Sequence, residues 1–260
     1  MIITVIPTNH GAGGKFCATS IAYGLRQKYS DARTRICLVD FDFKNPYLAM
    51  SLLSQVISVQ NDTRGVDSLL EKIDSNTLTD SLFNDNMIKV EGQFDILRGS
   101  KLNNAYEMFN RNHIETILEY LKNRYEYIII SVSPETDNAG TVFGLMHADK
   151  IVLVSRMNSE SFLNFGKGIS NIKHFRSGED KKANIIFNHR TMTNDIDFAP
   201  KLAHFKDDIN VLGYISYNDS LIDNRNISIG VKAKMDKFSS EYKKQVLDIV
   251  NKLVENKPAE

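Results

Sequence analysis

The chain has 260 residues, and its composition, with 42% apolar and 25% charged residues, is that of an ordinary globular protein rather than a disordered one. Basic and acidic residues number 32 each, so the formal net charge is zero, which does not fit a protein that coats nucleic acid through a basic excess. No run of 18 apolar residues predicts a transmembrane helix, and residues 1–4 lack the charged region of a signal peptide. The two cysteines, Cys17 and Cys37, have no metal-ligand or redox spacing, so we expect a reduced, cytoplasmic chain.

Short apolar runs alternate with amphipathic segments along the chain. The runs that predict strands are 2–6, 35–40, 94–97, 126–132, 151–154, 184–187 and 211–215. Apolar residues at helical spacing predict helices around 18–25 and 114–121. Such runs are typical of parallel strands that helices cover on both faces, so we predict an α/β fold with a doubly wound, mostly parallel sheet in a single domain, 1–260. Within it, 56–104 is richer in Asn, Asp and Ser and is interpreted as a polar surface region.

One more helical stripe lies near the end of the chain. Its apolar residues are Phe238, Tyr242, Val246, Ile249, Val250 and Leu253. We expect this helix to pack on the sheet, since stripes of this kind usually belong to the core. The alternative is a helix on a membrane surface, but its polar face mixes Glu241, Asp248 and Glu255 with lysines, which disfavours an anionic membrane.

A glycine-rich loop connects the first predicted strand to the first predicted helix. It reads Pro7-Thr8-Asn9-His10-Gly11-Ala12-Gly13-Gly14-Lys15-Phe16-Cys17. A strand, a glycine-rich loop and a helix are what a phosphate-binding loop needs, because glycines let backbone N–H groups point inward and the helix N-terminus adds positive potential. We therefore interpret this segment as a phosphate-binding loop or its descendant rather than as a tight turn.

Further segments, in the same order and at similar spacing, carry a resemblance to one family. They are 40–46, 65–70, 94–99, 125–134, 148–150, 185–190, 211–215 and 218–219. Together with the loop they resemble the ParA/MinD superfamily of P-loop ATPases with a deviant Walker motif, a group that includes TadZ/CpaE-type pilus-localisation proteins. The resemblance extends over nearly the whole chain.

This resemblance implies a P-loop NTPase fold that binds ATP or ADP. Asp40, from the second acidic motif, would position the attacking water or a metal-bound water. The implied nucleotide-binding residues are Gly11, Ala12, Gly13, Gly14, Lys15, Phe16 and Cys17 from the loop, with Asn188 and Arg190 from the strand that contacts adenine. The family also implies a homodimer, a protein partner in a localisation or transfer machine, and in some members binding to DNA.

The family loop, G-K-G-G-V-G-K-[ST]-T, fits this chain in two registers. The first aligns lysine with lysine, so that Lys15 reaches the phosphates, His10 replaces the signature lysine and Phe16 replaces the hydroxyl that binds Mg²⁺. This register keeps one of the two family lysines.

The second register follows the helix. Family helices place apolar residues seven and eleven positions after the phosphate lysine, and Ile21 and Leu25 stand at those offsets from Gly14. Asn9 then replaces the signature lysine, Gly14 the phosphate lysine, and Lys15 the hydroxyl. We prefer this register, because the buried face of a helix tolerates slips poorly. Neither register supplies a hydroxyl for Mg²⁺, so we predict no metal ligand and leave Mg²⁺ open.

A further departure is Ser131, which stands where the family has the Walker B aspartate that holds Mg²⁺ through water. Asp40 and Asp42 remain, and their spacing at a strand end places both side chains on one side. They are either a functional pair or a turn pair, since aspartates are common in turns at strand ends.

Three smaller signals are interpreted without a specific function or with one as an alternative. His10 either contacts a phosphate or simply fills the loop, and Cys17 is interpreted as a small packing residue. A basic stretch, Lys173, His174, Arg176, Lys181 and Lys182, is interpreted as a solvated helix end rather than a DNA-binding surface.

These departures predict a degenerate ParA/MinD-like protein that binds nucleotide weakly or without hydrolysis. It would act in the cytoplasm, or at the periphery of a membrane complex, as a spatial-organisation or assembly factor for a secretion, pilus, conjugation or partition system. The alternatives are an active ATPase with an atypical P-loop and a DNA-binding adaptor. Efficient ATP hydrolysis is not expected, because phosphoryl transfer depends on positioning and on neutralisation of charge.

Overall fold

The computed structural model describes residues 1–31, 33–52, 62–90, 92–175, 182–191, 198, 200–216 and 239–255. The apolar runs of the sequence form the strands. They are β1 (Ile2–Pro7), β2 (Ile36–Asp40), β3 (Asp95–Leu97), β4 (Tyr127–Ser131), β5 (Lys150–Arg156), β6 (Ala183–Arg190) and β7 (Ile209–Ser216). Within the described ranges they make a seven-stranded sheet in the order β3-β2-β4-β1-β5-β6-β7, and all six neighbouring pairs are parallel. The predicted doubly wound α/β fold is therefore confirmed.

Helices connect the strands, as parallel pairing requires. They are α1 (Gly14–Lys28), α2 (Leu48–Leu52), α4 (Val66–Asp74), α5 (Asp80–Asp85), α6 (Ala105–Met108), α7 (Arg111–Lys122), α8 (Ala139–Met146), α9 (Ser159–Leu163), α10 (Phe165–Phe175), the short 3₁₀ helix η1 (Ala203–Phe205) and α14 (Ser240–Glu255). None of these described helices is both long and apolar enough to cross a membrane.

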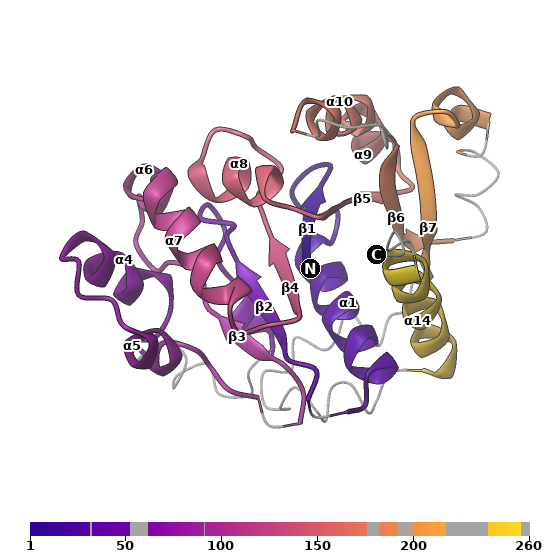
Figure 1. The fold of residues 1–260 in the computed structure, drawn as a ribbon. Helices are drawn as coiled ribbons and strands as arrows, with labels where there is room; N and C mark the ends of the chain where they lie inside the picture. Colours follow the sequence, from indigo (N-terminus) through magenta and orange to yellow (C-terminus); the bar gives the residue numbers. More distant parts are fainter. Residues whose placement is uncertain are drawn as a thin grey trace.

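The sheet has a hydrophobic core on each face, because successive side chains of a strand point to opposite sides. In β4, Ile128 and Ile130 belong to the core that α4, α7, α8 and α10 cover, whereas Ile129 belongs to the core under α1, α2 and α14. Figure 1 shows α1 and α14 running close together beside the strands. Both faces are thus closed by helices, which explains why the central strands are apolar almost throughout.

Helix α14 packs on the sheet and on α1, so the core interpretation of the C-terminal stripe is confirmed. Tyr242, Val246 and Ile249 are buried, and the hydroxyl of Tyr242 lies 2.5 Å from Ser20 Oγ of α1. Gly24 permits this close approach, because a Cβ there would lie 2.7 Å from Val250. Phe238, the first residue of the predicted stripe, lies outside the described residues.

The region predicted as a polar surface, 56–104, contributes side chains to the core as well as to the surface. Val66 and Leu69 of α4 and Phe83 of α5 are fully buried, and β3 forms one edge of the sheet. In the basic stretch, Lys173 pairs with Asp208 at the end of α10. Arg176 and Lys181 lie outside the described residues.

Candidate functional site

The glycine-rich loop lies at the carboxyl edge of the sheet, between β1 and α1. Gly11 and Gly13 adopt left-handed backbone conformations, with φ of 84° and 98°. At Gly13 a side chain is also excluded by space, because a Cβ would lie 2.0 Å from Asn188 Nδ2. Gly14 begins α1, so the first N–H groups of that helix have no partner inside the helix and the positive end of its dipole lies at the loop.

Asn188 and Arg190, both predicted from the adenine strand, stand at the end of β6. Asn188 is buried beneath the loop, where its Nδ2 donates to the carbonyl of Ala12 over 3.1 Å. Its Oδ1 is buried and has no hydrogen-bond partner. The guanidinium of Arg190 lies over the ring of Tyr214, 4.2 Å from the ring centroid. The structure therefore brings Asn188 to the loop, whereas Arg190 lies against Tyr214 of β7.

A cavity of about 330 Å³ opens beside the loop. The loop, the chain after β2 and the end of β4 line it through Pro7, His10, Gly11, Gly13, Gly14, Lys15, Phe16, Asp42, Asn45, Tyr47, Ser131 and Val132. Cys17 is buried behind this wall, and burial raises the pKa of its thiol, so the prediction of a packing residue is confirmed. Among the described residues, no group of three His, Cys, Asp or Glu side chains is placed to hold a metal ion.

Lys15 points at the two predicted carboxylates. Its Nζ bonds to Asp42 Oδ2 and lies 4.0 Å from Asp40 Oδ1. Asp40 is fully buried, and desolvation raises its pKa to about 6, although Lys15 acts in the opposite direction. One ammonium therefore stands against two buried carboxylates at this end of the sheet.

The same aspartates also hold the turn after β2. Asp40 accepts from the N–H groups of Asp42 and Leu48, at 3.2 and 3.0 Å, and the second of these bonds caps the start of α2. Asp42 accepts from the N–H of Asn45 at 3.1 Å. The two interpretations of this pair are thus compatible, because each carboxylate contacts both the backbone of the turn and Lys15.

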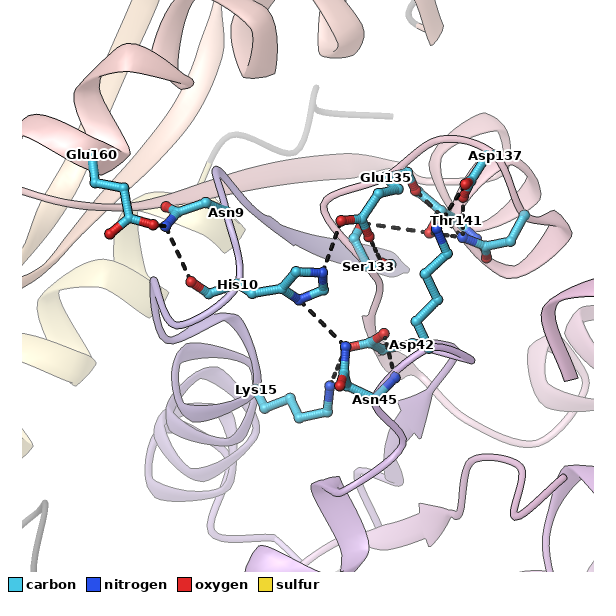
Figure 2. A network of polar contacts seen from close by, with 12 residues as sticks. Asn9, His10, Lys15, Asp42, Asn45, Ser133, Glu135, Asp137, Thr141 and Glu160 are labelled. Carbon is cyan, nitrogen blue, oxygen red and sulfur yellow. Dashed lines mark hydrogen bonds and ion pairs between the residues drawn. The ribbon is translucent and has the colours of Figure 1, made fainter. Parts of the chain in front are cut away.

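His10 ties the loop to its neighbours, as Figure 2 shows. Its Nε2 lies 2.8 Å from Glu135 Oε1, and its Nδ1 lies 3.4 Å from Asn45 Nδ2. Glu135 also accepts from Ser133. Sequence reasoning treated His10 as loop filler or a phosphate contact and missed Glu135 and Asn45, because no spacing in the sequence marks contacts between three separate loops.

Asn9 anchors the other side of the loop to the chain after β5. Its Nδ2 donates to Glu160 Oε1 over 3.0 Å, and its Oδ1 accepts from Ser161 over 2.8 Å. The loop is therefore held on both sides by side chains, at the two positions where the registers place the missing signature lysine.

Ser131 ends β4, directly beside Asp40 of β2 and Val5 of β1 in the sheet register. Its side chain is 1% exposed, and its Oγ has no hydrogen-bond partner. The sequence marked this position as a departure from an acidic motif, but only the structure shows that the hydroxyl is buried and unpaired at the cavity wall.

Comparison with known proteins identifies the fold. No family model matches the chain, and no curated protein matches it significantly in sequence. Solved structures match over almost the whole length: a ParA family ATPase from Chlorobium tepidum (TM-score 0.78, 18% identity, 96% of this chain and 98% of that chain), MinD in the MinC:MinD cell division complex of Aquifex aeolicus (0.74, 14%, 100% and 97%), and the septum site-determining protein MinD of Pyrococcus horikoshii with Mg-ADP (0.70, 13%, 97% and 95%).

The parallel sheet and the glycine-rich loop between its first strand and first helix define the fold of the P-loop NTPases. Within that class, the chain has the ParA/MinD fold, as its sequence motifs predicted.

Proposed function

We propose that this chain is a degenerate ParA/MinD-type protein. It binds the phosphates of a nucleotide at loop 11–17 without Mg²⁺ and does not hydrolyse the nucleotide efficiently. It serves as an assembly or spatial-organisation factor. The observation that carries this proposal is the ammonium of Lys15, which is bonded to Asp42 and lies 4.0 Å from Asp40. A fixed monovalent cation occupies the place where two carboxylates would otherwise attract a metal.

The residues of the cavity do not fit Mg²⁺. This ion demands near-octahedral oxygen ligands at about 2.0–2.1 Å and loses its water shell reluctantly. The two loop registers assign the Mg²⁺-binding hydroxyl to position 16 or to position 15, and these positions hold Phe16 and Lys15. Ser131 is neutral at the position where an acidic side chain would balance the charge of the metal. We therefore route no step of the proposal through a metal.

The geometry of α1 supports the second loop register. Lys15, in the first turn, faces the aspartates, whereas the ring of Phe16 packs against Tyr242 of α14 with 5.8 Å between ring centroids. A hydroxyl at position 15 would face the acids, and one at position 16 would face α14. Ile21 and Leu25, on which this register depends, are buried against the sheet.

An anion has suitable contacts even so. The N–H groups at the start of α1 and the positive end of the helix dipole favour a phosphate there. The MinD of Pyrococcus horikoshii holds Mg-ADP, and we infer a nucleotide at the equivalent loop of this chain, held without the metal.

Efficient hydrolysis would need charge neutralisation that these residues do not supply. Loss of a single electrostatic donor typically costs about 10²-fold in rate or more, and here the hydroxyl, the acid and the signature lysine are all replaced. A bound nucleotide would then hold a conformation that a protein partner recognises. MinD of Aquifex aeolicus forms a complex with MinC, which makes a protein partner a reasonable inference for this fold.

Calorimetric titration with ATP, in Mg²⁺ and in EDTA, tests the proposal. We expect the same dissociation constant in both buffers, and a loss of about tenfold or more for Lys15→Ala, since a charged hydrogen bond to the ligand is removed. Lys122→Ala is the matched control, because Lys122 is an exposed residue at the end of α7 and lies outside the cavity. Light scattering is expected to show a monomer–dimer distribution that ATP does not shift.

The alternatives have distinct outcomes in these assays. Binding that vanishes in EDTA, or steady Mg²⁺-dependent turnover at ordinary ATPase rates, would replace the proposal with an active ATPase. Salt-sensitive retention on DNA without nucleotide would favour the DNA-binding adaptor.

A further inference from the structure

Among the described residues that line the cavity, Ser131 has a buried polar side-chain atom without a hydrogen-bond partner. Its Oγ is buried and forms no hydrogen bond, and the residue is 1% exposed. A buried hydroxyl without a partner costs free energy, and native proteins rarely keep one without a reason. Two neighbouring side chains of the cavity do have partners, since Lys15 bonds to Asp42 and Asp42 accepts from the N–H of Asn45.

Ser131 lines the same cavity as the loop. Ser131 belongs to the cavity of about 330 Å³ that Gly13, Gly14 and Lys15 also line. Alternation along β4 places Ser131 on the α1 side of the sheet, as it does Ile129, which packs in the core under α1. The residues at the start of α1 and Ser131 at the end of β4 thus border one cavity, and both offer hydrogen-bond donors.

We propose that Ser131 is an anion-binding residue: it donates its hydroxyl hydrogen directly to a phosphate oxygen of a metal-free di- or triphosphate in this cavity. The inference rests on the proposed function and deepens it, because it states how the phosphates are held when no metal screens them.

The chemistry of the position favours this role. An aspartate at the end of β4 would be a third carboxylate beside Asp40 and Asp42 and would repel a bare phosphate, which only a bound cation would offset. A serine cannot serve the cation but has a proton to donate, and a hydrogen bond to a charged acceptor is worth about twice a neutral one. The replacement therefore converts a group that needs the metal into one that works without it.

The ligand class follows from the size of the cavity and the kind of donor. A hydroxyl, an ammonium and the N–H groups of a helix start suit tetrahedral oxyanions, and about 330 Å³ accommodates two or more linked phosphates. Two sources share this chemistry: the phosphate tail of a nucleotide and free pyrophosphate. Titrations with ATP and with inorganic pyrophosphate separate them.

The experiment measures binding of both probes in EDTA to the wild type and to Ser131→Ala, Ser131→Thr and Ser131→Asp. We expect Ser131→Ala to weaken binding about tenfold, Ser131→Thr to retain it within about threefold, and Ser131→Asp to weaken it about 100-fold or more. The matched control is Ser100→Ala, since the Ser100 hydroxyl is also buried but is bonded to Asp67 and lies outside the cavity. This control should stay within about twofold of the wild type.

Thermal unfolding gives a second readout that does not depend on the ligand. Because the Ser131 hydroxyl has no partner to lose, Ser131→Ala should melt at the same temperature as the wild type or higher. A lower melting temperature would show that the hydroxyl has a structural partner and would overturn the inference.

The binding outcomes separate this inference from the proposed function. If the wild type binds ATP in EDTA and Ser131→Ala binds it equally well, Ser131 is not a donor and only this inference fails. If Ser131→Asp binds as tightly as the wild type in EDTA, the charge argument fails as well. If the wild type binds neither probe with or without Mg²⁺, the proposed function itself is wrong.

Discussion

Replacement of Asp40 by asparagine tests the electrostatics of the site in the molecule without ligand. Asp40 is fully buried at the end of β2, and its pKa is raised from the ordinary 3.8 to about 6, chiefly by desolvation. A shift of this size corresponds to about 3 kcal/mol of difference between the folded and unfolded chains. No discount for solvent screening applies, since the side chain is not exposed.

The sign of the effect follows from which state binds the proton more tightly. The folded chain holds the Asp40 proton up to about pH 6, whereas the unfolded chain releases it near pH 4. The contribution of Asp40 to the free energy of unfolding therefore falls as the pH rises from about 4 to about 6, and is flat above that. An asparagine cannot ionise, so Asp40→Asn should gain about 3 kcal/mol relative to the wild type between pH 4 and pH 7.

Asp40→Asn also lowers the free energy of unfolding by an amount that does not depend on pH. Asp40 accepts from two backbone N–H groups, those of Asp42 and Leu48, and an amide has only one oxygen to offer them in this geometry. One buried donor then loses its acceptor, at about 1–3 kcal/mol, at every pH. The pH dependence of the difference, rather than its absolute value, is therefore the informative quantity.

Urea unfolding of both proteins at a series of pH values and fixed ionic strength measures the difference. Asp137→Asn is a control of opposite sign: a hydrogen bond from Lys44 lowers the pKa of Asp137, so its contribution is lost as the pH falls. This control effect should be small, since the Asp137 side chain is 60% exposed. A difference between Asp40→Asn and the wild type that stays constant from pH 4 to pH 7 would refute the raised pKa of Asp40.

Three further substitutions test the loop and the contact between α1 and α14. Gly13→Ala should abolish anion binding and lower the free energy of unfolding by more than about 1 kcal/mol, because φ is 98° and a Cβ would lie 2.0 Å from Asn188 Nδ2. Gly11→Ala should lower the free energy of unfolding less, because φ is 84° but the space around a Cβ is open. Equal losses for the two variants, in calorimetry and in urea unfolding, would contradict this. Tyr242→Phe should lower the free energy of unfolding by about 1 kcal/mol, because the buried bond to Ser20 Oγ is lost; an unchanged urea midpoint would show that this bond contributes nothing.

The strands and the position of the loop were predictable because they depend on local pattern. Apolar runs with polar ends mark buried parallel strands, and the ends of β2 and β4 place Asp40 and Ser131 at the same edge of the sheet whatever the loops do. The burial of the C-terminal stripe was predictable for the same reason, since its spacing matches one face of a helix.

The contacts that shape the site were not predictable, because they join segments that are distant in sequence. Asn188 lies beneath Ala12 across 176 positions, and His10 meets Glu135 in a loop that no motif marks as its neighbour. Such pairs depend on rotamers and loop conformations, which the pattern of apolar residues does not encode. The same applies to the direction of Lys15, whose ammonium meets Asp40 at the end of β2 and Asp42 just after it.

The two registers of the loop can be separated by restoring the family motif in each. In the second register the restored chain is Gly14→Lys with Lys15→Thr and Ser131→Asp, and in the first it is Phe16→Thr with Ser131→Asp. We expect only the former to gain Mg²⁺-dependent ATP binding, because position 15 faces Asp40 and Asp42 whereas position 16 faces α14. Lysine at 14 must displace Pro7 slightly, since a Cβ there lies 3.1 Å from that ring, so Gly14→Ala with the other two changes serves as the steric control. Calorimetry in Mg²⁺ and EDTA decides between them: a metal requirement that appears only in the variant with threonine at 16 would show that Lys15 is the phosphate lysine and that the second register is wrong.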